Sequence, residues 1–474
     1  MKNNYKLKII CLLCVLTALF SNCKKSDLTE EKGLVGNHNN LASGGDGKND
    51  VLGYGYNVLG EYANASAATY SVIDVDRLKI DQPTRVEWDL STKQEGTLEA
   101  GSDAVSYLKK LTTRFSNTFG ADFLGLSLFR ATITSTYSNT DSYSSKYIYS
   151  SYNLKIQQKR VKFNAPNDLL QNYLDPAFLT DVQNQSPEYI VNRYGTHVLT
   201  DIILGAKLSV MYQSESSKSD KITASTAGID VGVKTIFKIN TGYTYDGNDV
   251  RENTNQKLHY KTIGADPSKS LIGEIVIGNG ANPNPVPNVV ISGWQSTSKV
   301  ENSVMIDIAP NGLIPIYDLI PDQTKALAVK NYIIQFLTAN QVSLTPTTFY
   351  EYYNPVTNRH AYSLAGNLEQ SWANYYHNAE PFKVYTTQYA GAVPLYQFYN
   401  SAFDNRVLTT NRYPGFSGYN YDGILCYVYQ TPTTGTVPVY EFYSSTGGHL
   451  YTTNRNTVFP GWSYNGQPFY AFPN

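Results

Sequence analysis

The four residues Tyr194-Gly195-Thr196-His197 decide the fold of this chain, because they stand where a short predicted helix meets a long predicted strand. The helix begins at Ser186-Pro187-Glu188, where a serine suits the N-cap and a proline suits the first turn. Gly195 can supply the left-handed stop of this helix. The residues from His197 to Val210 are rich in Val, Ile and Leu, which predicts the strand.

Several landmarks follow this motif in order. They are Gly205, Gly264-Ala265-Asp266-Pro267, Trp294, the run Leu313 to Ile320 and a predicted helix from Thr324 to Leu337. Together with Tyr194-Gly195-Thr196-His197 they resemble the signature of the membrane attack complex/perforin (MACPF) family. The resemblance implies an α+β domain over residues 51–340, with a bent central antiparallel sheet like that of the cholesterol-dependent cytolysins, flanked by helical clusters. It also implies that Gly205 lies at the bend of the sheet, where this chain has Ala206 in place of a second glycine.

The signature residues are expected to be structural. The six histidines stand at positions 38, 197, 259, 360, 377 and 449, and no two of them have the spacing of metal ligands on one element. We therefore expect His197 to pin the end of the helix to the sheet. The sequence contains no nucleophile elbow, phosphate-binding loop, dinucleotide fingerprint or zinc-protease helix. We expect no catalytic residue, no metal and no cofactor.

The resemblance implies that two helical clusters unwind into amphipathic hairpins and join a β-barrel in a membrane. A lipid-facing strand alternates apolar and polar residues, because successive side chains point to opposite sides. Residues 229–245 alternate in this way, with Ile236 as an exception, and Asp246-Gly247-Asn248-Asp249 then predicts a turn. The candidates for the membrane-facing side are Ile229, Val231, Val233, Phe237, Ile239, Tyr243 and Tyr245.

The same segment can also form a helix. Its apolar residues at steps of four and three are Ile229, Val233, Ile236 and Phe237. This spacing predicts a helical face that packs on a core in the soluble protein. An ordinary strand with one face in solvent would alternate just as well as a membrane strand.

The first insertion region, from about residue 100 to about residue 140, is less regular. A helix is expected from Ala104 to Phe119, because apolar residues recur there at steps of three and four. Beyond the helix the alternation of apolar and polar residues changes face. This change indicates a β-bulge or a boundary between the sheet and the insertion region, and it does not define a strand register.

The N-terminus predicts export and a lipid anchor. Lysines precede a 12-residue apolar run, Ile9 to Phe20, which is too short to span a bilayer and is typical of a signal peptide. Phe20-Ser21-Asn22-Cys23 resembles the lipobox of bacterial lipoproteins, which implies removal of residues 1–22 and lipidation of Cys23. An ordinary secretory signal with an incidental cysteine is the alternative. Residues 23–50 are polar and glycine-rich, which predicts a flexible tether.

Residues 345–474 have a different composition, with 20 of the 40 tyrosines and only 11 charged side chains. Three units recur at steps of 46 and 44 residues, beginning at Tyr350, Tyr396 and Tyr440, and they resemble the tyrosine-rich repeat modules of secreted bacterial proteins. Three such units of short strands predict an all-β domain of the β-trefoil type, with a three-bladed propeller as the geometric rival. Tyr-Asp-Gly at 421–423 and Tyr-Asn-Gly at 464–466 predict hairpin turns.

The tyrosine-rich repeats suit neutral polar ligands, because aromatic rings stack on the apolar faces of sugars while hydroxyls and amides form hydrogen bonds. Many of the repeated tyrosines are expected in the core of the repeats. His360, Arg406 and His449 occupy equivalent places in the three units. The ligand-binding candidates outside the repeated motifs are Arg412, Tyr413, Phe416, Arg455 and Trp462.

The composition limits the function further. With 38 basic and 39 acidic side chains the net charge is −1, which argues against a nucleic-acid partner. The leading hypothesis is a secreted or surface-exposed lipoprotein of the bacterial outer membrane, resembling the antimicrobial proteins of Bacteroidales. It would bind a surface glycan or outer-membrane protein, assemble into a homo-oligomeric ring and insert into the lipids of a target membrane. A non-lytic adhesin, favoured by Ala206, and a glycan-degrading enzyme are the alternatives.

Overall fold

The computed structural model describes residues 49–115, 125–137, 141–456 and 460–474. The predicted signal peptide, Cys23 and nearly all of the predicted tether lie outside the described residues. No helix in the described part of the chain is long and apolar enough to cross a membrane. The helices are α2 (Val75–Asp81), α3 (Ala104–Thr113), α5 (Ala131–Thr134), α6 (Asn167–Leu170), α7 (Pro176–Asn184), α8 (Pro187–Tyr194), α9 (Lys221–Phe237), α10 (Ser292–Gln295) and α11 (Gln323–Ala339).

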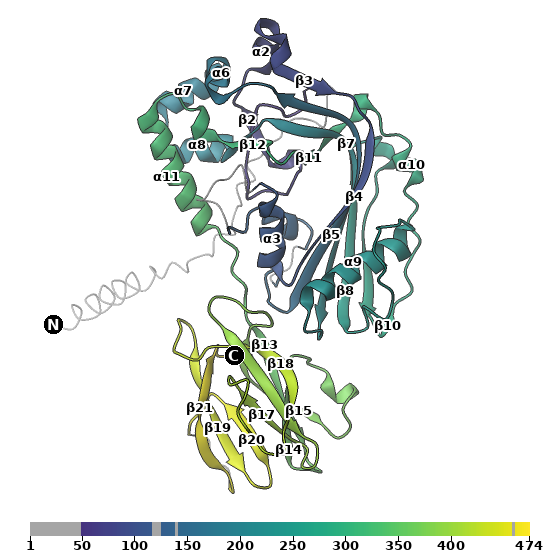
Figure 1. Ribbon diagram of the computed structural model, residues 1–474, viewed down its shortest axis with the longest axis vertical. Helices are drawn as coiled ribbons and strands as arrows, with labels where there is room; N and C mark the ends of the chain where they lie inside the picture. Colours follow the sequence, from purple (N-terminus) through teal and green to yellow (C-terminus); the bar gives the residue numbers. More distant parts are fainter. Residues whose placement is uncertain (1–48, 116–124, 138–140, 457–459) are drawn as a thin grey trace, which may run out of the picture. The chain divides into compact units, whose positions relative to one another are not determined.

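An antiparallel sheet of eight strands forms the centre of the first part of the chain (Figure 1). Its strand order is β10-β9-β8-β7-β5-β3, with β4 paired to β5 and β11 paired to β7. These strands are β3 (Val86–Asp89), β4 (Lys93–Gly101), β5 (Tyr147–Phe163), β7 (Asp201–Ser216), β8 (Asn253–Ile263), β9 (Ile272–Asn279), β10 (Asn282–Pro283) and β11 (Val304–Ile308). The α+β class and the large antiparallel sheet are confirmed.

The sheet changes its pairing at Gly205. Before this residue β7 pairs with β11, and from Lys207 onward it pairs with β8. On its other side β7 pairs with β5, whose register shifts between Gln157 and Lys159. A Cβ atom at position 205 would lie 1.9 Å from the carbonyl oxygen of Ile156, so only glycine fits this close approach of two backbones.

The two faces of the sheet differ in chemistry. Adjacent positions across β5 and β7 pair Leu154 with Leu208 and Tyr152 with Val210 on one face. This apolar face forms a core with α9 and Trp294, in which Ala206 is fully buried. The opposite face pairs Lys155 with Lys207 and is polar. A sheet with one apolar and one polar face needs a different packing layer on each face.

A smaller sheet lies beside the predicted signature. Its strand order is β12-β6-β1-β2, formed by Leu313–Pro315, His197–Leu199, Tyr54–Tyr56 and Ala68–Ser71. The long strand predicted from His197 is therefore interrupted after Leu199, and its second part, β7, extends to Ser216. The predicted helices before this sheet and at the end of the domain are confirmed as α8 and α11, which contact each other.

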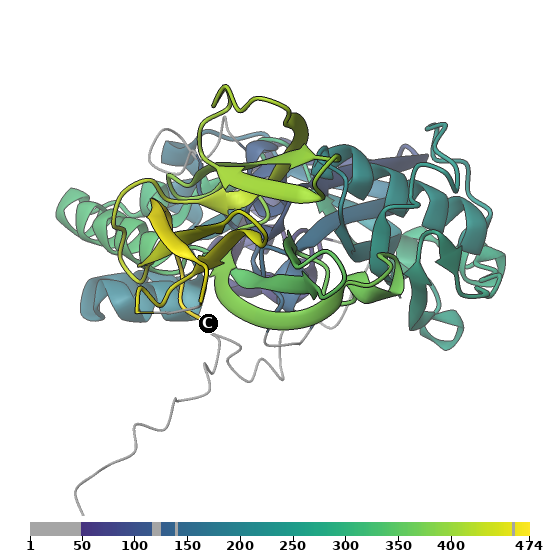
Figure 2. The same cartoon turned by 90° about the horizontal axis from the view of Figure 1, so that it is seen from below.

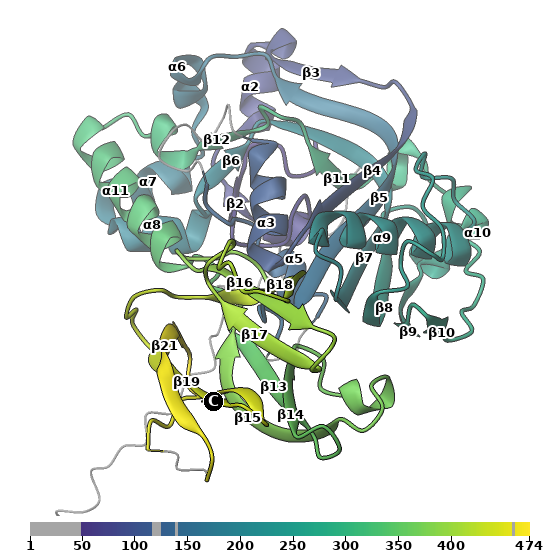
Figure 3. The same cartoon turned by 60° about the horizontal axis from the view of Figure 1, so that its bottom comes forward.

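The C-terminal repeats form three separate antiparallel sheets of three strands each (Figures 2 and 3). The first sheet has β13 (Thr347–Asn354), β14 (Arg359–Ser363) and β15 (Tyr376–Val384), and the second has β16 (Val393–Asn400), β17 (Asn405–Thr409) and β18 (Asn420–Val428). The third has β19 (Val437–Ser444), β20 (Gly448–Thr452) and β21 (Ser463–Ala471). In each sheet the first strand lies in the middle.

The all-β class and the three repeats are confirmed, but the strand connectivity differs from the predicted β-trefoil. A trefoil joins four strands of each repeat through a shared barrel, whereas each repeat here pairs three described strands within its own sheet. Single bridges link the ends of neighbouring sheets, such as Tyr385 with Tyr427 and Tyr429 with Tyr470. Buried residues of all three repeats nevertheless share one core, among them Phe349, Leu395 and Val439.

The two predicted hairpin turns are wrong. Residues 421–423 lie inside β18 and residues 464–466 lie inside β21. The pairing of β16 with β18 shifts register between Gln397 and Phe398, and that of β19 with β21 shifts between Glu441 and Phe442. Each Tyr-Asp/Asn-Gly sequence therefore lies opposite an irregularity within a strand, where a glycine is also common.

Gly205→Ala tests the close approach at the bend. We expect a loss of about 3 kcal/mol or more in the free energy of unfolding, because backbone atoms must shift to admit the methyl group. Urea unfolding followed by circular dichroism measures this loss. Gly247→Ala is the matched control, since a Cβ there meets no atom within 4 Å, and a similar loss in both variants would contradict the account.

Candidate membrane-inserting segment and ligand surface

The signature residues lie at the junction of α8 with the smaller sheet. The Ser186 side chain caps α8 by accepting from the Tyr189 backbone N–H at 3.2 Å. Gly195 ends the helix with a φ of +77°, and a Cβ there would lie 2.6 Å from the backbone of Tyr56. The predicted helix start and stop are therefore confirmed, and the helix end is held tightly against β1.

Thr196 and His197 continue this junction into the core. The Thr196 N–H donates to the Tyr56 carbonyl oxygen at 3.0 Å. The Nδ1 atom of the fully buried His197 lies 2.9 Å from the Thr196 hydroxyl. Burial lowers the pKa of His197 to about 3, so the imidazole is neutral at physiological pH. Tyr194 is also buried, and its hydroxyl donates to the Asp181 carboxylate at 2.8 Å.

The candidate membrane-inserting segment is mostly helical in this structure. α9 begins after Asp220, whose carboxylate accepts from the Thr223 N–H at 3.0 Å, and ends before Lys238, which has a φ of +57°. The residues of the predicted helical face are all buried against the apolar face of the sheet: Ile229, Val233, Ile236 and Phe237. The helical interpretation of the soluble state is therefore confirmed.

The remaining membrane-facing candidates have different surroundings. Val231 is partly buried in α9, and Ile239 is partly buried beside the same core. The rings of Tyr243 and Tyr245 stack with centroids 6.2 Å apart, and Tyr243 is exposed. The structure thus brings the first four candidates in α9 together and places the other three in the segment that follows it.

An ion pair in α9 joins a buried carboxylate to a partly exposed lysine. The Asp230 side chain is fully buried, and one of its oxygens accepts from the Lys234 Nζ atom at 2.6 Å. The other oxygen accepts from the Thr241 hydroxyl. Lys234 also donates to the Tyr243 carbonyl oxygen at 2.6 Å. These contacts fold residues 238–243 back onto the helix.

The polar face of the sheet contains a buried charge cluster that the sequence did not predict. Asp307 on β11 accepts from Lys155 at 2.7 Å, from Arg114 at 3.3 Å and from the Tyr62 hydroxyl at 3.0 Å. Burial would raise the pKa of Asp307, but the charges of Arg114 and Lys155 outweigh it and hold the pKa below its ordinary value. Burial lowers the pKa of the neighbouring Lys207 to about 8. A lone carboxylate in the apolar run Val304–Ile308 was the only signal in the sequence.

This cluster lies beneath the first insertion region. A cavity of about 20 Å³ separates the polar face from Tyr107 and Leu111 of α3, and from Thr132 and Thr136 of the α5 segment. A volume of this size holds about one water molecule. Arg114 follows α3 directly, so the ion pair with Asp307 fastens this region to the sheet. The helix predicted from Ala104 to Phe119 ends at Thr113, and residues 116–124 lie outside the described part.

The ligand-binding candidates of the C-terminal repeats fall into separate groups. The guanidinium carbon of Arg412 lies 3.5 Å from the centroid of the Tyr421 ring, and that of Arg455 lies 5.3 Å from the Tyr464 ring. Tyr413, beside Arg412, is 83% exposed. Phe416 is exposed and packs edge-on against Phe398. Trp462 is partly buried and packs against His360 of the first repeat, so it lies between repeats.

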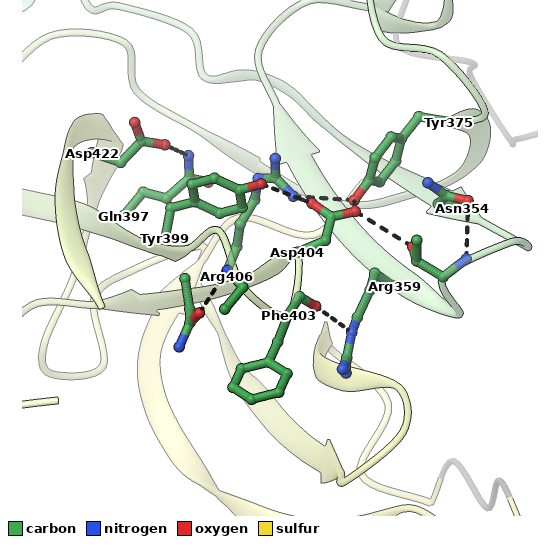
Figure 4. Close-up of polar contacts among 12 residues, drawn as sticks. Asn354, Arg359, Tyr375, Gln397, Tyr399, Phe403, Asp404, Arg406 and Asp422 are labelled. Atoms are coloured by element: carbon green, nitrogen blue, oxygen red, sulfur yellow. Dashed lines mark hydrogen bonds and ion pairs between the residues drawn. The ribbon is translucent and has the colours of Figure 1, made fainter. Parts of the chain in front are cut away.

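Arg406 anchors a second group that the sequence did not predict (Figure 4). The guanidinium lies 4.5 Å from the Trp372 ring centroid and 4.4 Å from that of Tyr399. It donates to Asp404 at 3.0 Å and to the Tyr375 hydroxyl at 3.1 Å. Arg406 is buried, which indicates that this group joins the first repeat to the second.

A bent antiparallel sheet with helical insertions in neighbouring hairpins is the architecture of the MACPF and cholesterol-dependent cytolysin class. The sequence profile of the MAC/Perforin domain family matches residues 38–344, which is more than half of the chain. The chain therefore belongs to the MAC/Perforin domain family. The profile of a domain of unknown function (DUF5648) matches residues 317–415 and 348–472, in the region of the repeats.

Many solved structures resemble the chain, among them those of two bacterial proteins. A protein with a MAC/Perforin domain from Bacteroides thetaiotaomicron is 17% identical with a TM-score of 0.50, over 78% of this chain and 71% of that protein. GNIP1Aa from Chromobacterium piscinae is 14% identical with a TM-score of 0.48, over 89% of this chain and 81% of that protein. The likeness to the first of these structures shows a shared fold. No curated protein sequence matches the chain.

The buried His197 predicts a specific pH dependence of stability. Its pKa is about 3 in the folded state and about 6.5 when unfolded, so the unfolded state binds more protons between these values. The stabilising contribution is complete above pH 6.5 and is lost as the pH falls toward 3, at up to about 1.4 kcal/mol per pH unit.

His197→Gln removes this titration. We expect a flatter dependence of the unfolding free energy on pH between 5.5 and 4 than in the wild type, although the variant is less stable at pH 7. Urea unfolding at several pH values measures both slopes. Equal slopes would mean that the buried imidazole does not contribute.

Proposed function

We propose that this chain is a lipid-anchored pore-forming protein that captures a surface receptor and inserts β-hairpins into the membrane of related bacteria. Residues 1–22 would be removed, Cys23 would carry lipid, and the tether to residue 50 would connect it to the outer membrane of the producing cell. Residues 51–340 would form the pore in a homo-oligomeric ring. Residues 345–474 would bind the receptor.

The connectivity of the central sheet carries this proposal. β4 and β5 are adjacent antiparallel strands joined by residues 102–146, and β7 and β8 are joined in the same way by residues 217–252. Unwinding the helices of each connection would lengthen an existing hairpin and leave the sheet intact. The second connection gives about 18 residues to each strand, which exceeds the roughly 10 tilted residues that cross a bilayer.

The side chains of residues 229–245 are compatible with both states. In the helix, the apolar residues at steps of three and four cover the sheet. In an extended strand, the apolar residues at odd positions would face lipid, while Asp230, Gly232 and Lys234 would face a water-filled lumen. The same side chains would therefore suit both the packed helix and the membrane strand.

The ion pair between Asp230 and Lys234 affects how α9 can leave the sheet. Asp230 is fully buried, so breaking its pair with Lys234 while the helix stays on the sheet would leave an uncompensated buried charge, which is unfavourable. Asp230 and Lys234 would both reach water in the strand, because both stand at even positions. We infer that α9 leaves the sheet as a unit, which makes the transition cooperative.

A non-lytic adhesin is the second candidate. The Ala206 methyl group is fully buried in the core beneath α9, at the second position of the bend. A bend that is filled in this way resists opening more than a pair of glycines would. A protein that kept α9 in place would bind its receptor without leakage.

A disulfide that locks α9 to the sheet tests the proposal. The Ser150 hydroxyl on β5 donates to the Ser225 carbonyl oxygen on α9 at 2.8 Å, and both side chains are fully buried. Ser150→Cys/Ser225→Cys places one thiol on β5 and one on α9 at the residues joined by this side-chain to backbone contact, and oxidation shows whether the two sulfurs reach bonding distance. We expect the oxidised variant to release no dye from vesicles of target outer-membrane lipids, and the reduced variant to release dye like the wild type.

The two single-cysteine variants are the matched controls, because neither can form the lock. The native Cys426 is buried, and burial raises the pKa of its thiol well above the ordinary value, so it does not compete. Equal leakage from the locked and wild-type proteins would contradict insertion of α9. Binding of the wild type to target cells without leakage or killing would favour the adhesin.

A further inference from the structure

Two repeats of the C-terminal domain present the same exposed group of side chains. In the second repeat the Arg412 guanidinium carbon lies 3.5 Å from the Tyr421 ring centroid and 5.7 Å from that of Tyr396. In the third repeat Arg455 lies over Tyr464, whose ring is 6.3 Å from that of Tyr440. The corresponding rings of Tyr396 and Tyr421 are 6.2 Å apart. Each group is therefore a pair of neighbouring tyrosines with an arginine over at least one of the two rings.

The turns that carry the two arginines are also alike. Each arginine ends a Thr-Thr-Asn-Arg sequence, at 409–412 and at 452–455. In both turns the first threonine hydroxyl accepts from the asparagine N–H at 3.1 Å. The asparagine side chain then accepts from the N–H two residues later at 3.0 Å. The same backbone geometry thus presents both guanidinium groups.

Packing does not explain this repetition. Tyr421 is 42% exposed and Tyr464 is 48% exposed, and Arg455 is exposed as well. The first repeat, which folds into the same sheet, has Gly366 at the arginine position and His377 at the tyrosine position. The fold of a repeat therefore does not need the group.

The two guanidinium groups are available to an anion. Among the described residues, no carboxylate forms an ion pair with Arg412 or Arg455. Five of the six acidic residues of the domain have other partners: Glu351 with His360 at 2.6 Å, Glu380 with His377 at 3.8 Å, Asp404 with Arg406 at 3.0 Å, Asp422 with the Gln397 amide at 2.6 Å and Glu441 with His449 at 2.5 Å. The guanidinium groups of Arg412 and Arg455 therefore lie at equivalent places in two repeats, and each can bind an anionic group.

We propose that the C-terminal domain has two equivalent sites, Arg412/Tyr396/Tyr421 and Arg455/Tyr440/Tyr464, each for a sugar that carries a carboxylate or a phosphate. The guanidinium edge donates paired hydrogen bonds to the anionic group, and a tyrosine ring stacks on the apolar face of the sugar. The inference rests on the proposed receptor-binding role of residues 345–474. It changes the expected ligand from a neutral glycan to an anionic one.

Calorimetric titration of the full chain with two short anionic probes tests the proposal. The probes are a galacturonate trisaccharide, which carries carboxylates, and a trimannoside 6-phosphate, which carries a phosphate. We expect two molecules of at least one probe to bind per chain. A comparison of the two probes shows whether the sites bind a carboxylate or a phosphate. The methyl ester of the first and the dephosphorylated form of the second, which lack the charge, are expected to bind at least tenfold more weakly.

Variants assign the sites. Arg412→Ala and Arg455→Ala are each expected to reduce the stoichiometry from two to one, and the double variant to abolish binding. Lys383→Ala removes one positive charge from the first repeat and is the matched control with a stoichiometry of two. Arg455 is exposed and Arg412 is partly exposed, and an unchanged circular dichroism spectrum excludes misfolding of either variant as the cause.

The proposal is overturned if neither anionic probe binds, if the uncharged forms bind equally well, or if the double variant keeps a stoichiometry of two. Dye release by the wild type separates this failure from that of the proposed function. Leakage without binding of either anionic sugar overturns the two-site proposal alone. Binding of two sugars per chain without leakage supports the sites and overturns pore formation.

Discussion

The apolar face of the central sheet must be covered, and α9 covers it. Leu154 and Leu208 are among the sheet residues that would meet water if the helix left. Exposing a fully buried leucine costs about 1.5–3 kcal/mol, so the helix cannot leave in solution without a large penalty. A membrane or a neighbouring copy in a ring would remove this penalty by covering the same surface. Burial of the apolar face of the sheet thus keeps α9 in place, and burial of the same face would favour assembly on a membrane.

The polar face is covered differently. Its charges are gathered around Asp307, and Arg114 ties the first insertion region to this carboxylate. Ion pairs lose strength when water enters, whereas the apolar cover does not depend on salt. Buried charges therefore hold the first candidate insertion region in addition to the apolar packing of α3, whereas apolar packing is the main contact of α9 with the sheet. An event that releases one region need not release the other.

Much of this organisation could be predicted from local sequence. Ser186 and Gly195 marked both ends of α8, and the apolar steps from Ile229 to Phe237 marked the buried face of α9. These signals are local, because a cap or a helical face is decided within a few residues. The family landmarks added the sheet, and the profile match confirmed the family.

The rest depended on contacts between distant residues. Asp307 meets Lys155, which is 152 positions away, and Arg406 meets the first repeat through Tyr375. No spacing rule connects such residues. The repeats predicted three units correctly but left their strand connectivity open, and the glycines at 423 and 466 indicated turns where the strands in fact continue. Glycine serves turns and strand irregularities equally well, so the sequence alone did not separate them.

The central claim is that residues 229–245, of which 229–237 belong to α9 in this structure, change to a membrane strand. An environment-sensitive fluorophore placed on single cysteines along this segment measures it most directly, in solution and on vesicles of target outer-membrane lipids. The account predicts a burial pattern with a period near 3.6 residues over 229–237 in solution, and a period of two over 229–245 on vesicles, with the odd positions in lipid. A helical period that persists on vesicles, under conditions in which the protein releases dye, would contradict the account.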